Sequence, residues 1–265
     1  MNSMFYPRSI VCLTEESVEV LGHLGRLDLV KGVSVFVKRP EEALQIPKVS
    51  YFTSSNLEKI VDLKPDLILG FSDIQKDIAR DLIGLGLNVH IANHRTLQGI
   101  LDYTLMLASL IGEREKGILL VDRLNRKMEQ AQKSAEQLMV KPRVYFEEWD
   151  EPMISAIGWV SELIELAGGQ DLFAHKSKGI LAKDRFVSSD EVVLQNPQII
   201  LGCWCGKKVN LNHFKERPNW SNIEAIENSK VFELEPEIFL QPGPAPILDG
   251  LDLLYHILSD GNLKK

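Results

Sequence analysis

Residues 54–70 place the strongest constraint on how this chain can fold. Ser55 or Asn56 can cap the first turn of a short helix, because the side-chain oxygen of either accepts a hydrogen bond from an amide group that the helix leaves free. Pro65 ends that helix, and the apolar run Leu67–Leu69 that follows is typical of a buried strand. The segment is therefore predicted to be a helix followed by a strand, the unit from which α/β proteins are built.

The same alternation is predicted for the rest of the N-terminal half. Strands are expected at Ile10–Leu13, Gly32–Phe36, Leu67–Phe71 and Asn88–Ile91. Helices are expected at Ser17–Leu24, Asn56–Leu63, Ile74–Leu85 and 97–111. Because strands and helices alternate with short connections, the half should form a mostly parallel sheet covered by helices.

A second α/β series begins after Pro142. Its strands are expected at Arg143–Phe146, Ile199–Gly202 and Lys230–Glu233, and its helices at Val160–Ala167, Asp190–Leu194 and Pro244–Ser259. Between the two series, Glu113–Met139 carries apolar residues at intervals of three and four, which predicts one long helix. Roughly 27 helical residues would span about 40 Å. The helix is either a surface helix of one domain or a strut joining two lobes.

Three segments resemble the substrate-binding proteins of metal-chelate ABC importers, which bind cobalamin or ferric siderophores. They are Asn56–Leu69, Trp159–Phe173 with its Ala-Gly-Gly ending, and Ser188–Leu201. The resemblance covers roughly residues 8–259. It implies two Rossmann-like lobes with parallel-sheet cores, joined by one long α-helix, with a ligand cleft between the lobes. The predicted domains are 1–112 for the N-terminal lobe, 113–139 for the connecting helix and 140–265 for the C-terminal lobe.

Ligands of open α/β sheets bind outside the carboxyl ends of the strands. The loops predicted there are rich in aromatic rings, which suit a flat, partly apolar ligand such as a corrin, although such rings also pack in cores and lids. The candidate ligand-binding residues are Glu15, Phe36, Lys38, Phe52, Phe71, Trp149, Trp159, Trp204 and Gln241. The predicted function is non-catalytic binding of a metal chelate, a corrinoid first, with a ferric siderophore or haem as alternatives.

An acidic cluster follows the predicted strand that ends at Phe146. Glu147, Glu148, Asp150 and Glu151 form either a solvated loop or, in an alternative reading, the acid and base of an enzyme that also uses Gln241. Cys203 and Cys205, together with His213, suggest a soft-metal site, but the spacing of the two cysteines is shorter than zinc sites use, and packing is the alternative. No cofactor and no metal site are predicted.

Glu58 and Asp190 lie near the starts of the two matching short helices. The helix dipole favours an acidic residue at these positions without any further role. The resemblance implies a second role, because in these importers an acidic residue on a short helix of each lobe docks into a basic pocket of the permease. Glu58 falls on the first such position and Asp190 on the second, with Glu191 as the neighbouring option.

Composition limits the partners and the compartment. The net charge is −7 with no basic block, which argues against nucleic acid, and no apolar run reaches the roughly 20 residues that cross a bilayer. No basic and then apolar stretch of the kind found in export leaders precedes the first strand, and the three cysteines are an odd number. These features predict a cytoplasmic monomer with reduced thiols, or a periplasmic protein if a leader was removed.

Overall fold

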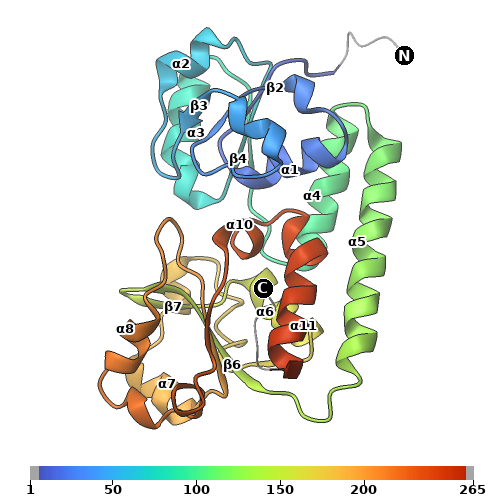
Figure 1. Cartoon of the computed structure of the whole chain (residues 1–265). Coiled ribbons are helices and arrows are strands. Elements are labelled where there is room, and N and C mark those ends of the chain that lie inside the picture. Colours follow the sequence, from blue (N-terminus) through green and yellow to red (C-terminus); the bar gives the residue numbers. More distant parts are fainter. Residues whose placement is uncertain (1–5, 261–265) are drawn as a thin grey trace. The chain divides into compact units, whose positions relative to one another are not determined.

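The computed structural model describes residues 6–260, and the chain divides into two compact units (Figure 1). The first unit comprises Met1–His94, Gln98–Leu124 and Gln241–Pro244, and the second comprises Arg95–Leu97, Asn125–Leu240 and Ala245–Lys265. The domain limits predicted from the sequence, and the cleft between the lobes, stay predictions. The predicted cellular location rests on the start of the chain. Part of that segment lies outside the described residues, which begin at Tyr6.

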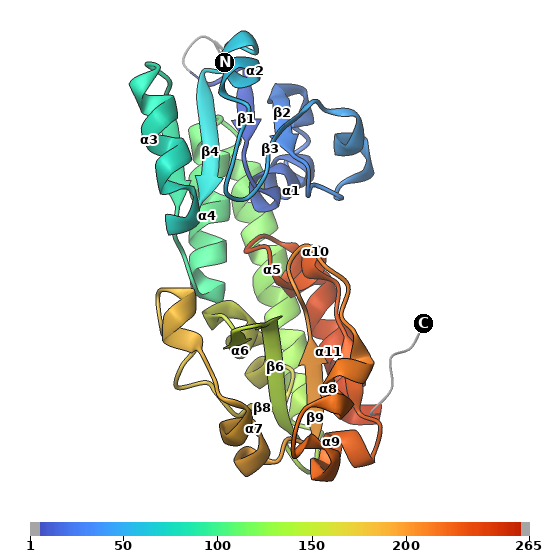
Figure 2. The ribbon, with the colours of Figure 1, turned by 90° about the vertical axis from the view of Figure 1, so that its left-hand side faces the viewer.

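The first unit contains a five-stranded sheet in the order β3-β2-β1-β4-β5, with all neighbours parallel (Figure 2). The strands are β1 (Ile10–Cys12), β2 (Val30–Ser34), β3 (Lys48–Ser50), β4 (Leu67–Phe71) and β5 (Val89–Ala92). The predicted strand Leu67–Phe71 is confirmed residue for residue. Strand β3 was not predicted, because three residues bounded by a lysine and a serine give no apolar pattern.

Helices cover both faces of this sheet. They are α1 (Glu15–His23), α2 (Leu57–Asp62), α3 (Lys76–Gly84) and α4 (Leu97–Leu110), with 3-10 turns η2 (Leu27–Leu29), η3 (Glu41–Gln45) and η4 (Asp73–Gln75). Ile10 and Cys12 pack in one cluster with residues of α1 and α4, whereas Val11 packs with residues of α2 and α3. Successive strand residues thus face opposite layers, as a sheet buried on both faces requires.

The long helix α5 runs from Arg114 to Ala135, so its 22 residues span about 33 Å. It ends four residues before the predicted Met139, whose side chain is fully exposed. Its first turn lies close to α4, since a Cβ atom at Gly117 would come within 2.4 Å of the Ala108 methyl group. The division between the two units falls inside this helix, after Leu124.

The second unit contains a sheet in the order β10-β9-β6-β7, with β8 also paired to β6, and only β7 is antiparallel. The strands are β6 (Arg143–Asp150), β7 (Met153–Ser155), β8 (Gln170–Asp171), β9 (Ile199–Gly202) and β10 (Val231–Glu233). The prediction that Glu147–Asp150 form a loop is therefore wrong, because β6 continues through Glu147 to Asp150. Its side chains alternate between the faces of a sheet instead of sharing one solvated loop.

The helices of the second unit include the predicted ones and several shorter ones. They are α6 (Gly158–Leu166), α7 (Ser189–Gln195), α8 (Leu211–Glu216), α9 (Glu224–Glu227), α10 (Pro236–Phe239) and α11 (Leu251–Asp260), with 3-10 turns η5 (Ala182–Arg185) and η6 (Trp220–Asn222) and a π-helical turn η7 (Pro246–Gly250). One core cluster joins Tyr145, Phe214 and Trp220. The expectation of two α/β lobes with parallel-sheet cores is confirmed by both sheets. Within the described part of the chain, no helix is long and apolar enough to cross a membrane.

Candidate ligand-binding site

In the first sheet, the strands that follow β1 are added first on one side, as β2 and β3, and then on the other side, as β4 and β5. Crevices for ligands form at such a switch in strand order, which here lies between β1 and β4. Gln75 ties the two strand ends together. Its side-chain amide group donates to the Leu13 carbonyl at 3.3 Å, and its side-chain oxygen accepts from the Phe71 amide at 3.0 Å. Ser72, next along, has a φ of 64°, a region that non-glycine residues rarely adopt and that is common at functional sites. This edge is thus held in one defined conformation.

Glu15 and Glu16 follow β1 but have different surroundings. Glu16 is 1% exposed, and the Thr14 hydroxyl donates to its carboxyl group at 2.6 Å. Burial raises the pKa of Glu16, and hydrogen bonds from Thr14 and Ser17 only partly offset this. Glu15, predicted to contact the ligand, is half-buried at the start of α1. It is the residue of the pair that a ligand at this edge can reach.

Aromatic rings gather on two loops of the first unit. Phe36 and Phe52 stack with ring centroids 4.1 Å apart, and Tyr51 approaches Phe36 edge-on at 6.2 Å. The predicted pair is therefore brought together, although Phe36 and Phe52 come from different loops. Tyr51, which is 56% exposed, was missed as a candidate, and its place beside Phe52 was the available signal. The exposed Lys38 follows Phe36 by two residues.

Phe71 and Gln241 lie elsewhere in the first unit. Phe71 ends β4, is half-buried, and meets the His94 ring edge-on at 5.2 Å. Gln241 is 5% exposed, and its amide group donates to Glu19 at 3.0 Å. His94 forms a hydrogen bond of 2.9 Å to the Pro242 carbonyl. Residues 241–244 are therefore fastened to this unit from far along the sequence, and the buried Gln241 acts as a support in this structure.

In the second unit, one lysine joins two of the predicted tryptophans. The Lys207 ammonium group lies 4.3 Å from the centre of the Trp149 ring and 4.8 Å from that of Trp204, and it pairs with Asp150 at 2.6 Å. Trp149 is half-buried, and its indole N–H donates to the Glu151 carbonyl. This ring stands at the carboxyl end of β6 with its orientation fixed, as an aromatic contact for a ligand would require.

The other two predicted tryptophans lie in the core. Trp204 is 3% exposed, and its indole N–H donates to Glu147 at 3.1 Å. Trp159 is 1% exposed on α6 and donates to the Phe239 carbonyl at 2.8 Å. Both were predicted to face a ligand, and in this structure neither ring offers a face to one. Aromatic composition alone does not separate a buried ring from an exposed one.

The acidic residues of β6 are each paired with a cation. Arg217 donates two hydrogen bonds, of 2.6 and 2.9 Å, to the fully buried Glu147. Arg185 pairs with Glu148 through both of its terminal nitrogens, and Lys207 pairs with Asp150. These bonds leave the three carboxylates neutralised and fixed. Within residues 6–260, no group of three or more His, Cys, Asp or Glu side chains is placed to hold a metal ion.

Glu58 and Asp190 occupy equivalent positions in the two units. Each is the second residue of its helix, α2 or α7, and each side chain is exposed. Asn56 caps α2, accepting from the Lys59 amide, and Ser188 caps α7 with Glu191 completing the capping box. The neighbouring Glu191 is thereby engaged, which leaves Asp190 as the carboxylate that faces solvent.

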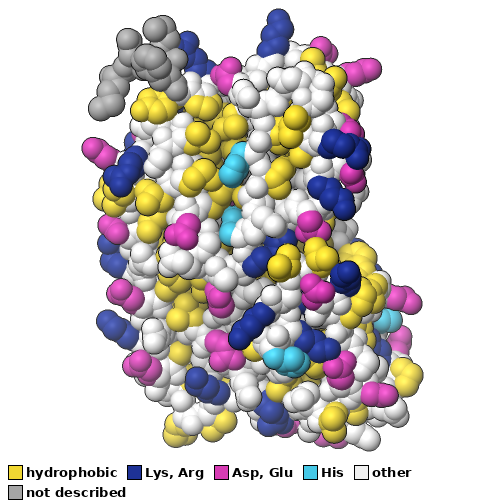
Figure 3. Space-filling view, turned by 180° about the vertical axis from the view of Figure 1, so that it is seen from behind, with side chains coloured by type: hydrophobic (Ala, Val, Ile, Leu, Met, Phe, Trp, Pro, Cys, Tyr) yellow, Lys and Arg dark blue, Asp and Glu magenta, His cyan; other side chains and the backbone are white. Residues whose placement is uncertain are grey.

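The outer charges are mixed. On the face shown in Figure 3, Lys and Arg side chains alternate with Asp and Glu and do not gather in one basic patch. A nucleic-acid surface requires such a patch, so this face does not provide one.

Comparison with known proteins relates this fold to a family. Residues 10–238 match the model of a family described as periplasmic binding protein. The chain is similar to the vitamin B12-binding protein of Vibrio vulnificus, with 26% identity over 247 residues, covering 90% of this chain and 86% of that protein.

Two solved structures share the fold. A periplasmic haem-binding protein of Pseudomonas aeruginosa aligns with a TM-score of 0.81 at 16% identity, covering 96% of this chain and 93% of that one. The vitamin B12-binding protein BtuF of Vibrio cholerae aligns with a TM-score of 0.75 at 22% identity, covering 95% and 96%. At these identities the likeness establishes the fold alone.

Proposed function

The chain belongs to the periplasmic binding protein family, and we propose that it binds a corrinoid such as cobalamin and passes it unchanged to the permease of an ABC importer. The similarity to vitamin B12-binding proteins over 90% of the chain supports this choice of ligand. The observation that carries the proposal is the aromatic group Phe36, Tyr51 and Phe52 of the first unit. Such rings bind the flat, partly apolar face of a macrocycle.

The test is a visible-absorbance titration with cobalamin, with haem and a ferric siderophore as separate titrants. We expect cobalamin to bind most tightly, and Phe36→Ala to weaken it by about 1–3 kcal/mol because a large ring contact is lost. Phe186→Ala, at an exposed ring of the second unit, is the control and should bind as the unchanged protein does. Equal binding by the Phe36 variant would remove Phe36 from the site, and no binding of cobalamin would reject the corrinoid.

Haem is the second candidate ligand, and two half-buried histidines favour it. His90, in β5, and His94, just after that strand, both stack against Tyr103, with ring centroids 6.4 and 5.1 Å away. Imidazole nitrogen is a common iron ligand. A change in the haem spectrum that His94→Ala removes would favour haem over the corrinoid.

Glu58 and Asp190 are proposed to dock the loaded protein onto the permease. Each is an exposed carboxylate in the first turn of a helix, and the described part of the chain gives neither an ion-pair partner. Glu58→Gln and Asp190→Asn should lower transport in reconstituted vesicles by about tenfold or more together, since each removes a charged contact. Ligand affinity should stay unchanged. Glu227→Gln, at another exposed carboxylate, is the control.

We further propose that the chain does no chemistry on its ligand. The family is described as one of binding proteins. The carboxylates that the enzyme hypothesis would use as acid and base form ion pairs with Arg217, Arg185 and Lys207. The family and the two solved structures are named as periplasmic, whereas the cytoplasmic location expected from the sequence stays a prediction. Fractionation of cells that express the native gene decides between the two locations.

A further inference from the structure

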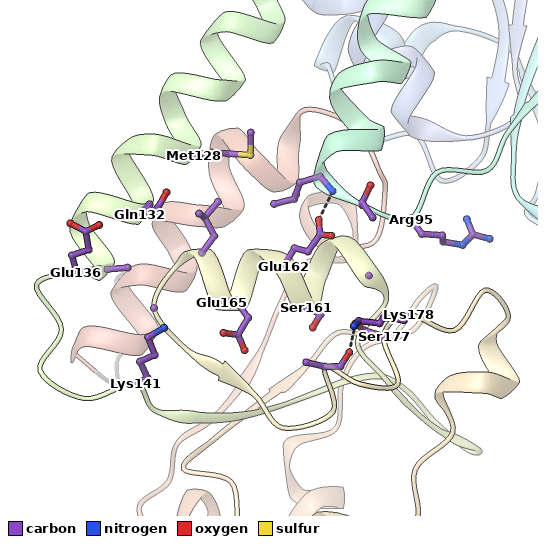
Figure 4. A pocket seen from close by; sticks show the side chains of 17 residues that line it. Arg95, Met128, Gln132, Glu136, Lys141, Ser161, Glu162, Glu165, Ser177 and Lys178 are labelled. Atoms are coloured by element: carbon purple, nitrogen blue, oxygen red, sulfur yellow. Dashed lines mark hydrogen bonds between the residues drawn. The ribbon is translucent and has the colours of Figure 1, made fainter.

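The second unit contains a cavity of about 940 Å³ (Figure 4). It is bounded by α5, α6 and the segments 95–97 and 174–178, and every residue that lines it belongs to this unit. Apolar atoms supply most of the lining surface, and Leu97, Met128 and Leu166 are its larger apolar side chains. A cavity of this volume fits a small organic molecule. None of the residues proposed for chelate binding lines it.

Two carboxylates on one helix line this cavity. Glu162 and Glu165 are three residues apart on α6, and in Figure 4 the Glu162 side chain lies above the helix and the Glu165 side chain below it. One oxygen of Glu162 accepts from the Leu97 amide at 2.6 Å, and one oxygen of Glu165 accepts from the Asp171 amide at 3.0 Å. These bonds fix both side chains. The second oxygen of each is left to a ligand, because within the described residues no cation pairs with either carboxylate.

Two lysines complete the charge pattern. In the view of Figure 4, Lys141 and Lys178 lie on opposite sides of the two glutamates. Both ammonium groups are exposed, and the described residues include no ion-pair partner for either. Glu136 also lines the cavity on the side of Lys141, and Arg95 on the side of Lys178. The cavity thus offers two carboxylates in its middle, a cation toward each end and hydrocarbon between them. A hydrated inorganic ion would match the charges but not the apolar lining.

From this pattern we infer a second binding site, for a small aliphatic zwitterion such as an amino acid with a terminal amino group. Its ammonium group binds the second oxygen of Glu162 or of Glu165, its carboxylate binds Lys141 or Lys178, and its hydrocarbon chain packs on Leu97, Met128 and Leu166. The inference does not rest on the proposed function, because the two sites share no residue.

The first experiment compares four probes of equal chain length in NMR titrations of labelled protein. 6-Aminohexanoate should bind, and hexylamine and hexanoate should each bind about tenfold more weakly, because each loses one charge-assisted contact. Hexanol should bind most weakly. Shifts are expected at the amides of Leu97 and Asp171, which donate to the two carboxylates. Absence of 6-aminohexanoate binding at millimolar concentration, or equal affinity for hexanol, would overturn the inference.

The second experiment uses charge-removing variants. Gln in place of Glu162 and Glu165 keeps an oxygen that accepts the same backbone hydrogen bonds, so the fold is preserved while the charges are lost. This double variant should bind 6-aminohexanoate at least about tenfold more weakly. Replacing Lys141 and Lys178 with Gln should weaken 6-aminohexanoate but leave hexylamine unchanged. Glu227→Gln and Lys215→Gln are the controls. Wild-type affinity in the Glu162/Glu165 variant overturns the site, and cobalamin binding should persist in all variants.

Discussion

Two buried carboxyl groups, Glu16 in the first unit and Glu147 in the second, are stabilised in different ways. Glu16 is hydrogen-bonded by the hydroxyl groups of Thr14 and Ser17, and burial raises its pKa. Glu147 is neutralised by Arg217 and also accepts hydrogen bonds from Tyr145 and Trp204. The first carboxyl group has hydroxyl partners, whereas the second has an arginine as its partner. The edge of the first sheet should therefore respond to pH, whereas that of the second should depend on its arginine.

Removal of Arg217 should have the largest effect on stability. Arg217→Met leaves the Glu147 carboxylate buried without its cation, which costs about 3–5 kcal/mol in the free energy of unfolding. The Arg217 side chain also lies over the Phe214 and Trp220 rings, at 4.9 and 4.6 Å, so packing is lost too. Urea unfolding measures the difference, with the exposed Lys215→Met as the control. An unfolding midpoint equal to that of the control would mean that the ion pair contributes nothing.

Substitutions of the two tryptophans near Lys207 should affect different properties, with Trp204 acting mainly on stability and Trp149 mainly on ligand binding. Trp204→Ala removes a core ring and should lower the free energy of unfolding by about 3–5 kcal/mol. Thermal melts measure this loss.

Trp149→Ala should lower the free energy of unfolding by less than Trp204→Ala does, because this ring is half-buried, and should weaken cobalamin binding by about 1–3 kcal/mol. The same titration that tests Phe36 measures it. If Trp149→Ala destabilises the protein as much as Trp204→Ala does, Trp149 is a core residue and not a ligand contact.

Glu16 should make stability fall as the pH rises. Because its folded pKa is raised, the unfolded chain loses the proton first, and stability is lost between the ordinary pKa of glutamate and the raised value. One such group contributes a slope of at most about 1.4 kcal/mol per pH unit. Glu16→Gln cannot ionise and should flatten this part of the profile, measured as urea midpoints from pH 4 to 8. An unchanged profile would place Glu16 ionised in the folded state.

The thiols should show the smallest effect, a difference in rate. Burial raises the pKa of Cys12 in the first unit and of Cys203 in the second, and both thiols should react slowly because the thiolate is the reactive form. Cys205 is half-buried and should react first with a disulfide reagent. None of the three, all within the described residues, forms a disulfide. Fast reaction of Cys203 in the native protein would show that the edge of the second sheet opens.

Much of the fold could be predicted because its signals are local. The cap at Asn56, the strand Leu67–Phe71 and the capping box at Ser188 are each contained in a few residues. Strand β7 and helix α8 were missed, since Met153–Ser155 is short and Leu211–Glu216 carries few apolar residues. The end of α5 was placed too late because the apolar spacing continues to Leu138 after the helix has stopped.

The candidate site was harder to predict than the fold. Phe36 and Phe52 were named from composition, and the structure stacks them. Trp159 and Trp204 were named for the same reason, yet they are buried. The sequence carries no mark that distinguishes the two cases, because the burial of a ring depends on which segments pack against it.

By itself the sequence determined the order of helices and strands, the parallel sheets and the resemblance to a binding-protein family, since caps, breakers and apolar runs act over neighbouring residues. Only the tertiary structure decided which charges meet. Arg217 lies 70 residues from Glu147 and Arg185 lies 37 from Glu148, and each pair converts an acidic cluster into fixed support for a sheet edge. Such pairs form where folding brings distant segments into contact, and burial makes their partners obligatory, so no local pattern specifies them.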